Sequence, residues 1–310
     1  MMDSNLIHPE LRAMTSRIPS VPVGKPWLPK IASAAFRIAP AAKGRAGVTR
    51  EWHSFGPGRG IYVYRPERPN GAALLWIHGG GMVIGSAKQD LGRMAKLAAE
   101  LGIVVACVEY RLAPANPHPL PLDDCHEAWT WLRVSSARLG VDRNRISIGG
   151  QSAGGGLTAG LTQRLHDEGG IQPIAQWLFC PMLDDRTATD RSLDAIKHPI
   201  WNNTSNFDGW SAYIGTPGSD DVPEYAAPSR RADLSGLAPA WVGTGTVELF
   251  YAENVEYARR LEAAGVRTVF DEVDGAPHAF ESMVANAPVS QAYMSRAKAW
   301  LAAQLEAATI

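Results

Sequence analysis

Short apolar runs alternate with helix-like segments through the middle of the chain, and this alternation restricts the fold more than any other feature of the sequence. Four of the runs have the composition of buried strands: "ALLWIH" (73–78), "IVVACVEY" (103–110), "RISIGG" (145–150) and "IAQWLFC" (174–180). The segments between them, such as 88–101 and 123–139, carry apolar residues at helical spacing. Because strands that alternate with helices pair in parallel, the sequence predicts an α/β fold with a mainly parallel central sheet and helices on both faces.

Two segments interrupt this alternation, which resumes after about residue 239. Residues 1–50 are rich in proline, and residues 186–236 are rich in Asp, Asn, Ser and Trp. Both contain large aromatic side chains that can pack against a body, which distinguishes them from disordered linkers. We interpret them as the N-terminal part and the second part of a lid over one α/β domain, made of residues 51–185 and 237–310.

Charge and cysteine content exclude several classes of protein. The 310 residues carry a formal net charge of −1, which gives nucleic acid or an anionic membrane surface no electrostatic reason to bind. No run approaches the roughly 18 apolar residues of a membrane span, and the first residues lack the pattern of a secretory signal. The three cysteines, Cys107, Cys125 and Cys180, fit neither a disulfide framework nor a metal site. We therefore expect a cytoplasmic protein without a metal.

A glycine-rich stretch, "GGQSAGGGL" (149–157), surrounds Ser152 directly after the third apolar run. It lacks the Lys-Ser or Lys-Thr of a phosphate-binding loop. It also matches the dinucleotide pattern G-x-G-x-x-A. That pattern belongs in the first strand–helix unit, which lies much earlier in this chain. A G-x-S-x-G pattern between a strand and a helix predicts instead a sharp turn that exposes the serine hydroxyl. Ser152 is therefore the candidate nucleophile.

A second glycine motif, "HGGG" (78–81), closes the first apolar run. Glycines allow backbone N–H groups to turn towards a substrate oxygen, and such donors stabilise the oxyanion that forms when a serine attacks an acyl group. The base in such a reaction is usually histidine. The chain contains eight histidines, among them His118 in a proline-rich turn, His166 late in a helix and His278 after a late apolar run, and these positions alone leave the base open.

Taken together, "HGGG", "YRLAP" (110–114), "GQSAGG" (150–155) and "GAPHAF" (275–280) resemble motifs of the hormone-sensitive-lipase-like branch of the α/β-hydrolase family, over about residues 50–305. The resemblance implies an α/β-hydrolase fold with a helical lid. It also implies a serine carboxylesterase that needs no cofactor. Carried over to this chain, it makes Ser152 the nucleophile and His278 the base. The oxyanion donors are then Gly80, Gly81 and the N–H of Ala153.

The acid departs from the Asp-Leu-Phe or Asp-Pro-Leu that is usual in this branch, because this chain reads "TVELF" (246–250). Alignment of "AENVEYARRL" (252–261) places Glu248 on the acid, 278 − 248 = 30 residues before the base. Glutamate can orient an imidazole as aspartate does, one methylene farther out. The rival carboxylates either follow the apolar run 174–180 or precede the base: Asp184, Asp185, Asp271, Glu272 and Asp274. A second departure is Gln151, where many relatives carry Asp or Thr.

Candidate pocket residues lie beside the oxyanion motif and in the second part of the lid: Met82, Val83, Trp201 and Phe207. Large aromatic side chains in the lid leave limited room, so we expect the small-molecule substrate to be a short- to medium-chain acyl ester. The alternatives are an amidase or deacetylase with the same triad, and a non-catalytic small-ligand receptor on the same fold. Relatives of this branch often pair through the last strand, here near "TVFDEV" (268–273), which implies a homodimer.

Overall fold

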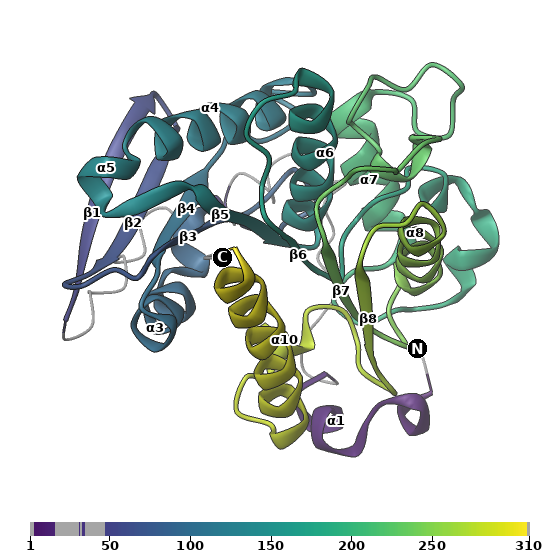
Figure 1. Cartoon of the computed structure of the whole chain (residues 1–310). Coiled ribbons are helices and arrows are strands. Elements are labelled where there is room, and N and C mark those ends of the chain that lie inside the picture. Colours follow the sequence, from purple (N-terminus) through teal and green to yellow (C-terminus); the bar gives the residue numbers. More distant parts are fainter. Residues whose placement is uncertain (1–2, 16–30, 32, 35–46, 309–310) are drawn as a thin grey trace.

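The sheet contains eight strands in the order β1-β2-β4-β3-β5-β6-β7-β8. A computed structural model describes residues 3–15, 31, 33–34 and 47–308, and Figure 1 shows the sheet with helices on both faces. The strands are β1 (Val48–Gly56), β2 (Arg59–Pro66), β3 (Gly71–Ile77), β4 (Val104–Glu109), β5 (Val141–Gln151), β6 (Gln176–Phe179), β7 (Ala240–Gly245) and β8 (Thr268–Val273). All pairs among β3 to β8 are parallel, which confirms the prediction of a mainly parallel sheet.

Strands β1 and β2 form an antiparallel hairpin at one edge of the sheet, which the alternating pattern did not predict. The sequence of β1, "VTREWHSFG", is largely polar, and Val48 is its one buried residue. A strand with a solvated face lacks the continuous apolar run that marks the inner strands. Because β1 begins at Val48, the sheet reaches into the segment 1–50, most of which lies outside the described residues.

The helices are α1 (Pro9–Thr15), α3 (Leu91–Leu101), α4 (Leu120–Val134), α5 (Ser136–Leu139), α6 (Ala153–Glu168), α7 (Asn203–Ile214), α8 (Tyr251–Ala263), α9 (Phe280–Met283) and α10 (Pro288–Ala307). Helices α4, α6 and α8 cover one face of the sheet, and α3 and α10 cover the other (Figure 1). This arrangement confirms the expected α/β class.

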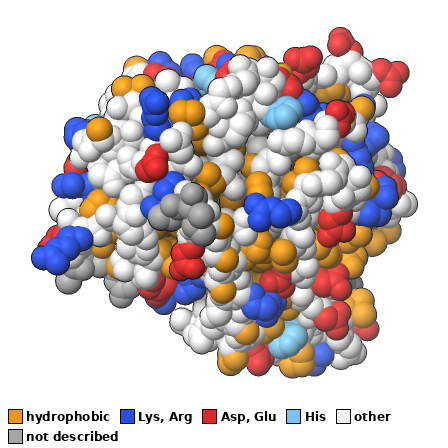
Figure 2. Space-filling view, viewed as in Figure 1, with side chains coloured by type: hydrophobic (Ala, Val, Ile, Leu, Met, Phe, Trp, Pro, Cys, Tyr) orange, Lys and Arg blue, Asp and Glu red, His pale blue; other side chains and the backbone are white. Residues whose placement is uncertain are grey.

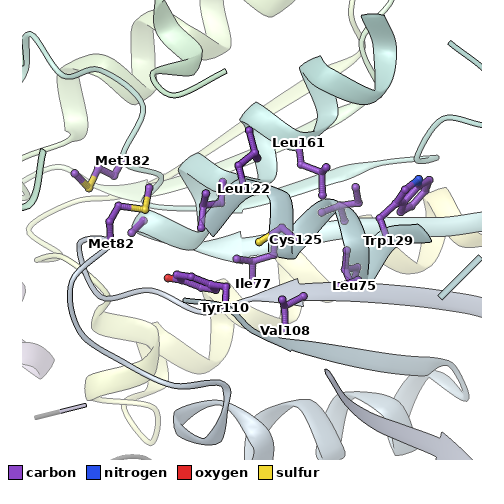
Figure 3. Close-up of a cluster of buried hydrophobic side chains, with 14 of the residues drawn as sticks. Leu75, Ile77, Met82, Val108, Tyr110, Leu122, Cys125, Trp129, Leu161 and Met182 are labelled. Carbon is purple, nitrogen blue, oxygen red and sulfur yellow. The ribbon is translucent and has the colours of Figure 1, made fainter. Parts of the chain in front are cut away.

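Alternate residues along each inner strand supply the two halves of the core. Leu75 and Ile77 of β3 pack with α4 and α6 on one face, whereas Trp76 packs with α3 and α10 on the other. Figure 3 shows the first face, where apolar side chains from strands and helices form a continuous layer. The layer ends in Met82 and Met182, just beyond the carboxyl ends of β3 and β6. The loops that leave this edge of the sheet are therefore built on a rigid base.

The insertion between β6 and β7, residues 186–236, contains α7 and lies against the loop that follows β3. The ring of Trp201 and the backbone of Gly209 both contact Gly81 in that loop. Asp185 joins the two ends of the insertion, because it accepts hydrogen bonds from Arg230 at 2.8 and 2.9 Å and from the N–H of Gly218 at 2.5 Å. Its carboxylate is fully buried.

Acidic and basic side chains are interspersed over the face drawn in Figure 2 rather than gathered by sign. In the part of the chain that the structure describes, this face therefore presents no extended patch of a single sign. Among the described residues, no helix combines the length and the apolar composition that spanning a lipid bilayer demands.

Candidate active site

Ser152 lies at a sharp turn between β5 and α6. Its φ of 57° and ψ of −122° fall outside the regions that residues with side chains usually adopt. The turn closes tightly, because a Cβ atom on Gly150 would lie 2.2 Å from the carbonyl oxygen of Gly154, and one on Gly154 would lie 2.2 Å from that of Ile77. Glycine at both positions therefore permits the turn. Helix α6 begins at Ala153, so Ser152 stands directly before its N-terminus.

His278 connects Ser152 to Glu248 through its two ring nitrogens. Its Nε2 lies 2.9 Å from Ser152 Oγ, and its Nδ1 lies 2.9 Å from Glu248 Oε2. With the ring proton on Nδ1, the imidazole donates to the carboxylate and accepts the serine hydroxyl proton. All three side chains are buried, with 6% of Ser152, 4% of His278 and 3% of Glu248 exposed. The sequence-predicted nucleophile, base and acid are thus brought into one hydrogen-bonded row.

Glu248 lies in the turn between β7 and α8, and its carboxylate is held from two sides. Oε1 accepts a hydrogen bond from the hydroxyl of Thr244 at 2.7 Å, and Oε2 accepts one from the N–H of Phe250 at 3.0 Å. The ring of Phe250 also lies edge-on to His278, with 5.3 Å between ring centres. These contacts fix the carboxylate in the orientation that faces the imidazole.

The five rival carboxylates bind other groups. Asp184 pairs with Arg186, Asp185 with Arg230 and Asp271 with Arg296, while Glu272 accepts from Tyr251 and Asp274 accepts from Thr246. These carboxylates form contacts at the surface or, for Asp185, at the base of the insertion. The geometry therefore favours Glu248 as the partner of His278.

The "HGGG" loop passes directly beside the nucleophile. A Cβ atom on Gly79 would lie 3.2 Å from the Cβ of Ser152, so the two backbones are in close contact. Gly80 and Gly81 follow with φ of 130° and 58°, and the Gly80 carbonyl accepts hydrogen bonds from the N–H groups of residues 83 and 84. The first amides of α6, including that of Ala153, have no intrahelical partner. Of the three predicted oxyanion donors, Ala153 therefore directly follows Ser152, and Gly80 and Gly81 follow the glycine that contacts it.

The predicted pocket residues divide into two groups. Met82, Val83 and Trp201 are buried, with 1%, 5% and 4% exposed, and the Trp201 ring lies against Gly81 of the "HGGG" loop. Phe207 instead faces solvent on α7 with 38% exposed, and the guanidinium of Arg191 lies 5.7 Å from the centre of its ring.

Two supporting residues were not predicted as part of the site. Thr244 holds the Glu248 carboxylate, and Tyr110 supports the "HGGG" loop by donating its hydroxyl to the His78 carbonyl at 2.9 Å and by stacking on the His78 ring. Tyr110 is the first residue of the motif "YRLAP", which is recognisable in the sequence but assigns no function to its tyrosine. Thr244 is a single threonine within a strand and belongs to no recognisable motif. Among the described residues, no cluster of His, Cys, Asp and Glu is arranged to hold a metal ion.

Comparison with known proteins gives a consistent result. The sequence profile of the alpha/beta hydrolase fold matches residues 74–282. The chain is 31% identical to the carboxylesterase NlhH of Mycobacterium tuberculosis, over 80% of this chain and 79% of NlhH. It is 30% identical to an ethyl acetate hydrolase of Pseudomonas putida, over 76% of this chain and 74% of that protein. With the esterase LipI of M. tuberculosis, 31% identical, the match covers 65% of this chain and 63% of LipI.

Solved structures agree with these sequence matches. A bacterial heroin esterase superposes with a TM-score of 0.86 at 33% identity, covering 97% of this chain and 98% of that chain. The esterase LipW of Mycobacterium marinum superposes with a TM-score of 0.79 at 29% identity, covering 97% of each chain.

Proposed function

Because this chain belongs to the α/β-hydrolase family, in its hormone-sensitive-lipase-like branch of carboxylic ester hydrolases, we propose that it cleaves short- to medium-chain acyl esters through an acyl-enzyme on Ser152. One observation carries the proposal. The row Glu248–His278–Ser152 is continuous, with 2.9 Å at each contact. A base within hydrogen-bond reach of a hydroxyl, itself oriented by a carboxylate, is the arrangement that activates a serine.

In the proposed reaction, Ser152 Oγ attacks the ester carbonyl carbon while His278 Nε2 takes the hydroxyl proton. Glu248 stabilises the imidazolium that forms. The carbonyl oxygen becomes an oxyanion and accepts hydrogen bonds from the N–H groups of Gly80, Gly81 and Ala153. As the tetrahedral intermediate collapses, His278 gives its proton to the departing alcohol.

The second half of the reaction repeats these roles with water. His278 removes a proton from a water molecule, whose oxygen attacks the acyl carbon, and Ser152 leaves with that proton. The N-terminus of α6 adds the positive end of the helix dipole beneath the developing negative charge. Each hydrogen-bond donor to the oxyanion typically contributes about 2.7–4 kcal/mol to transition-state stabilisation.

The preference for short acyl chains is supported by the packing over the oxyanion loop. Trp201 covers Gly81 from the insertion, and Met82 lies against Gly156, so bulky buried groups stand next to the proposed reaction centre. The similarity to a protein named ethyl acetate hydrolase points in the same direction. The complete row from acid to nucleophile favours an enzyme over a ligand receptor, which would have no use for it.

Initial rates with p-nitrophenyl acetate, butyrate, octanoate and palmitate test the proposal, together with p-nitroacetanilide for amide cleavage. We expect kcat/KM to fall as the chain lengthens beyond the medium-chain esters, and Ser152→Ala to lose activity by about 10⁴-fold or more. A fluorophosphonate probe should add its mass to the peptide that contains Ser152 in the wild type and not in Ser152→Ala. Turnover of the anilide alone would replace the esterase by an amidase, and neither turnover nor labelling would favour a receptor.

A further inference from the structure

The residue before the nucleophile reaches across to the loop that carries the base. Gln151 ends β5 and is 5% exposed. Its side-chain amide donates to Glu281 Oε1 and, at 2.7 Å, to Ser282 Oγ. Both acceptors belong to α9, the short helix that begins two residues after His278. A contact independent of the Ser–His–Glu row therefore joins the same two segments.

The acceptor in this contact is a buried carboxylate with a defined environment. Glu281 is 2% exposed, and Arg93 Nη1 lies 3.9 Å from the same Oε1 that accepts from Gln151. Arg93 comes from α3, where it donates to Asp90 at 2.9 Å and lies 5.0 Å from the centre of the Trp76 ring. Burial raises the pKa of Glu281, whereas Arg93 and the Gln151 amide lower it. Glu281 thus anchors α9 to β5 and to α3.

The backbone between His278 and Glu281 needs this anchor. Ala279 has a φ of 55°, in the left-handed region that a residue with a Cβ atom rarely adopts. Such a conformation persists where the structure fixes the chain on both sides. On one side His278 is held by Ser152 and Glu248, and on the other side Glu281 is held by the contacts just described.

We propose that Gln151 and Glu281 are a positioning pair, whose hydrogen bond fixes the loop of the base to the strand of the nucleophile and so sets the approach of His278 to Ser152. The inference rests on the proposed function of the Ser–His–Glu row. Glutamine suits this place because its amide donates to a carboxylate without adding charge beside the nucleophile. An aspartate at position 151 would bring two carboxylates together in a buried place.

Four variants separate the hydrogen bond from the charge. Gln151→Leu removes the donor, and Gln151→Glu opposes two carboxylates. Glu281→Gln removes the charge but keeps a carbonyl acceptor for Gln151. The exchange Gln151→Glu with Glu281→Gln restores one donor and one acceptor in reversed order. Because a displacement of about 1 Å can reduce a rate 10²-fold, we expect kcat to fall about 10- to 100-fold in Gln151→Leu and Gln151→Glu.

The pattern across the set distinguishes positioning from plain stability. We expect KM for p-nitrophenyl butyrate to change by less than about three-fold, Glu281→Gln to keep most of the activity, and the exchange to recover most of the loss caused by Gln151→Glu. Gln163→Leu is the matched control. Gln163 lies in α6, is 1% exposed, and donates its side-chain amide to the Pro228 carbonyl at 2.9 Å. This control should lower the melting temperature and leave kcat unchanged.

Two outcomes would overturn the positioning pair. One is a Gln151→Leu variant that loses stability as Gln163→Leu does and keeps its kcat. The other is an exchange variant that folds, by its melting temperature, and remains as slow as Gln151→Glu. If the wild type itself cleaves no ester and Ser152 takes no fluorophosphonate, the proposed function fails instead, so the two failures are distinguishable.

Discussion

Met82, Ser152, Cys180 and Ala279 all have a positive φ, although none of them is glycine. Each such conformation costs of order 1–3 kcal/mol and persists only where the surroundings fix it. Met82, Ser152 and Cys180 lie in the segments that follow β3, β5 and β6, and Ala279 lies in the loop after β8, next to His278. The folded body therefore holds the site in a geometry that the separate segments would not keep.

Gly81, a proposed oxyanion donor, lies in direct contact with Trp201 of the insertion. A Cβ atom there would lie 2.1 Å from the Trp201 ring, at a φ of 58°. We predict that Gly81→Ala lowers kcat/KM by about 10- to 100-fold, because the collision displaces an oxyanion donor. Initial rates with p-nitrophenyl butyrate measure the effect, and adding Trp201→Val should recover part of it.

Gly265→Ala is the matched control for this prediction. Gly265 has a φ of 80° with no atom within 4 Å of a new Cβ, so the change adds backbone strain without a collision. It should cost about 1 kcal/mol of folding free energy and leave kcat/KM unchanged. Equal losses of rate in Gly265→Ala and Gly81→Ala would contradict a local effect on the oxyanion loop.

Glu248 should be the carboxylate on which the rate depends. Replacement by Gln keeps the shape but places an amide opposite His278 Nδ1, which favours the wrong tautomer, and we expect kcat to fall by about 10³- to 10⁴-fold. Asp184→Asn serves as control, because Asp184 pairs with the exposed Arg186, and its kcat should stay within about two-fold of wild type. A slow Asp184→Asn beside an active Glu248→Gln would reverse the assignment.

At the scale of elements, helix α8 is attached to the start of the insertion through one buried carboxylate. Glu253, in its first turn, accepts hydrogen bonds from the N–H of Leu183 at 2.7 Å, from that of Asp184 at 3.3 Å and from the hydroxyl of Thr187. Burial raises the pKa of Glu253 well above its usual value, although the contacts with Thr187 and Leu183 lower it. The folded chain therefore holds this proton more tightly than the unfolded chain does.

A pH-dependent stability follows from this difference in proton affinity. As the pH rises from the ordinary pKa of 4.5 towards the raised pKa in the folded state, the folded state binds more protons than the unfolded state, so the free energy of unfolding falls. Each unit by which the pKa is raised corresponds to about 1.4 kcal/mol. We predict that Glu253→Gln removes this loss, so that its urea midpoint decreases less than that of the wild type between pH 5 and pH 8.

Glu256→Gln on the same helix is the control for this prediction. Glu256 is exposed and pairs with Arg259, which lowers its pKa, so its replacement should leave the pH dependence unchanged. If Glu253→Gln follows the wild-type curve, the carboxyl of Glu253 does not titrate differently in the folded state.

The element boundaries show where local sequence patterns mislead. Helix α6 begins at Ala153, and its first turn contains three glycines, which helix propensity alone would not place in a helix. Those glycines are required by close contacts with backbone from other elements, such as the Met182 carbonyl 2.2 Å from a Cβ on Gly156. A contact between distant segments cannot be read from the local pattern.

At the scale of the whole molecule, Asp185 holds the insertion 186–236 onto the body. Its carboxylate is fully buried, and Asp185→Ala would leave the Arg230 guanidinium and the Gly218 N–H without their acceptor. We predict a loss of about 2–4 kcal/mol in the free energy of unfolding, measured by urea denaturation. Asp184→Ala next to it removes a more exposed pair and should cost less than about 1 kcal/mol; equal losses would contradict the assignment.

The sequence predicted the inner strands, the fold class and the members of the Ser–His–Glu row, because each is marked by a local run or motif. It did not predict the hairpin of β1 and β2, whose composition is mostly polar. It also gave no role to Thr244 or to the contact between Gln151 and Glu281, which are 130 positions apart. Such pairs leave no periodic signal, since only the folded sheet brings them together.

The path of the chain through the sheet also sets when a new molecule can become active. Ser152 and His278, the proposed nucleophile and base, are separated by 126 residues, and His278 follows the last strand of the sheet. At a synthesis rate of about 5–20 residues per second, roughly 6–25 s pass after Ser152 is made before His278 exists. A growing chain on the ribosome thus carries Ser152 without its proposed base, and on the proposed mechanism ester cleavage would begin only once synthesis has passed the C-terminal part of the sheet.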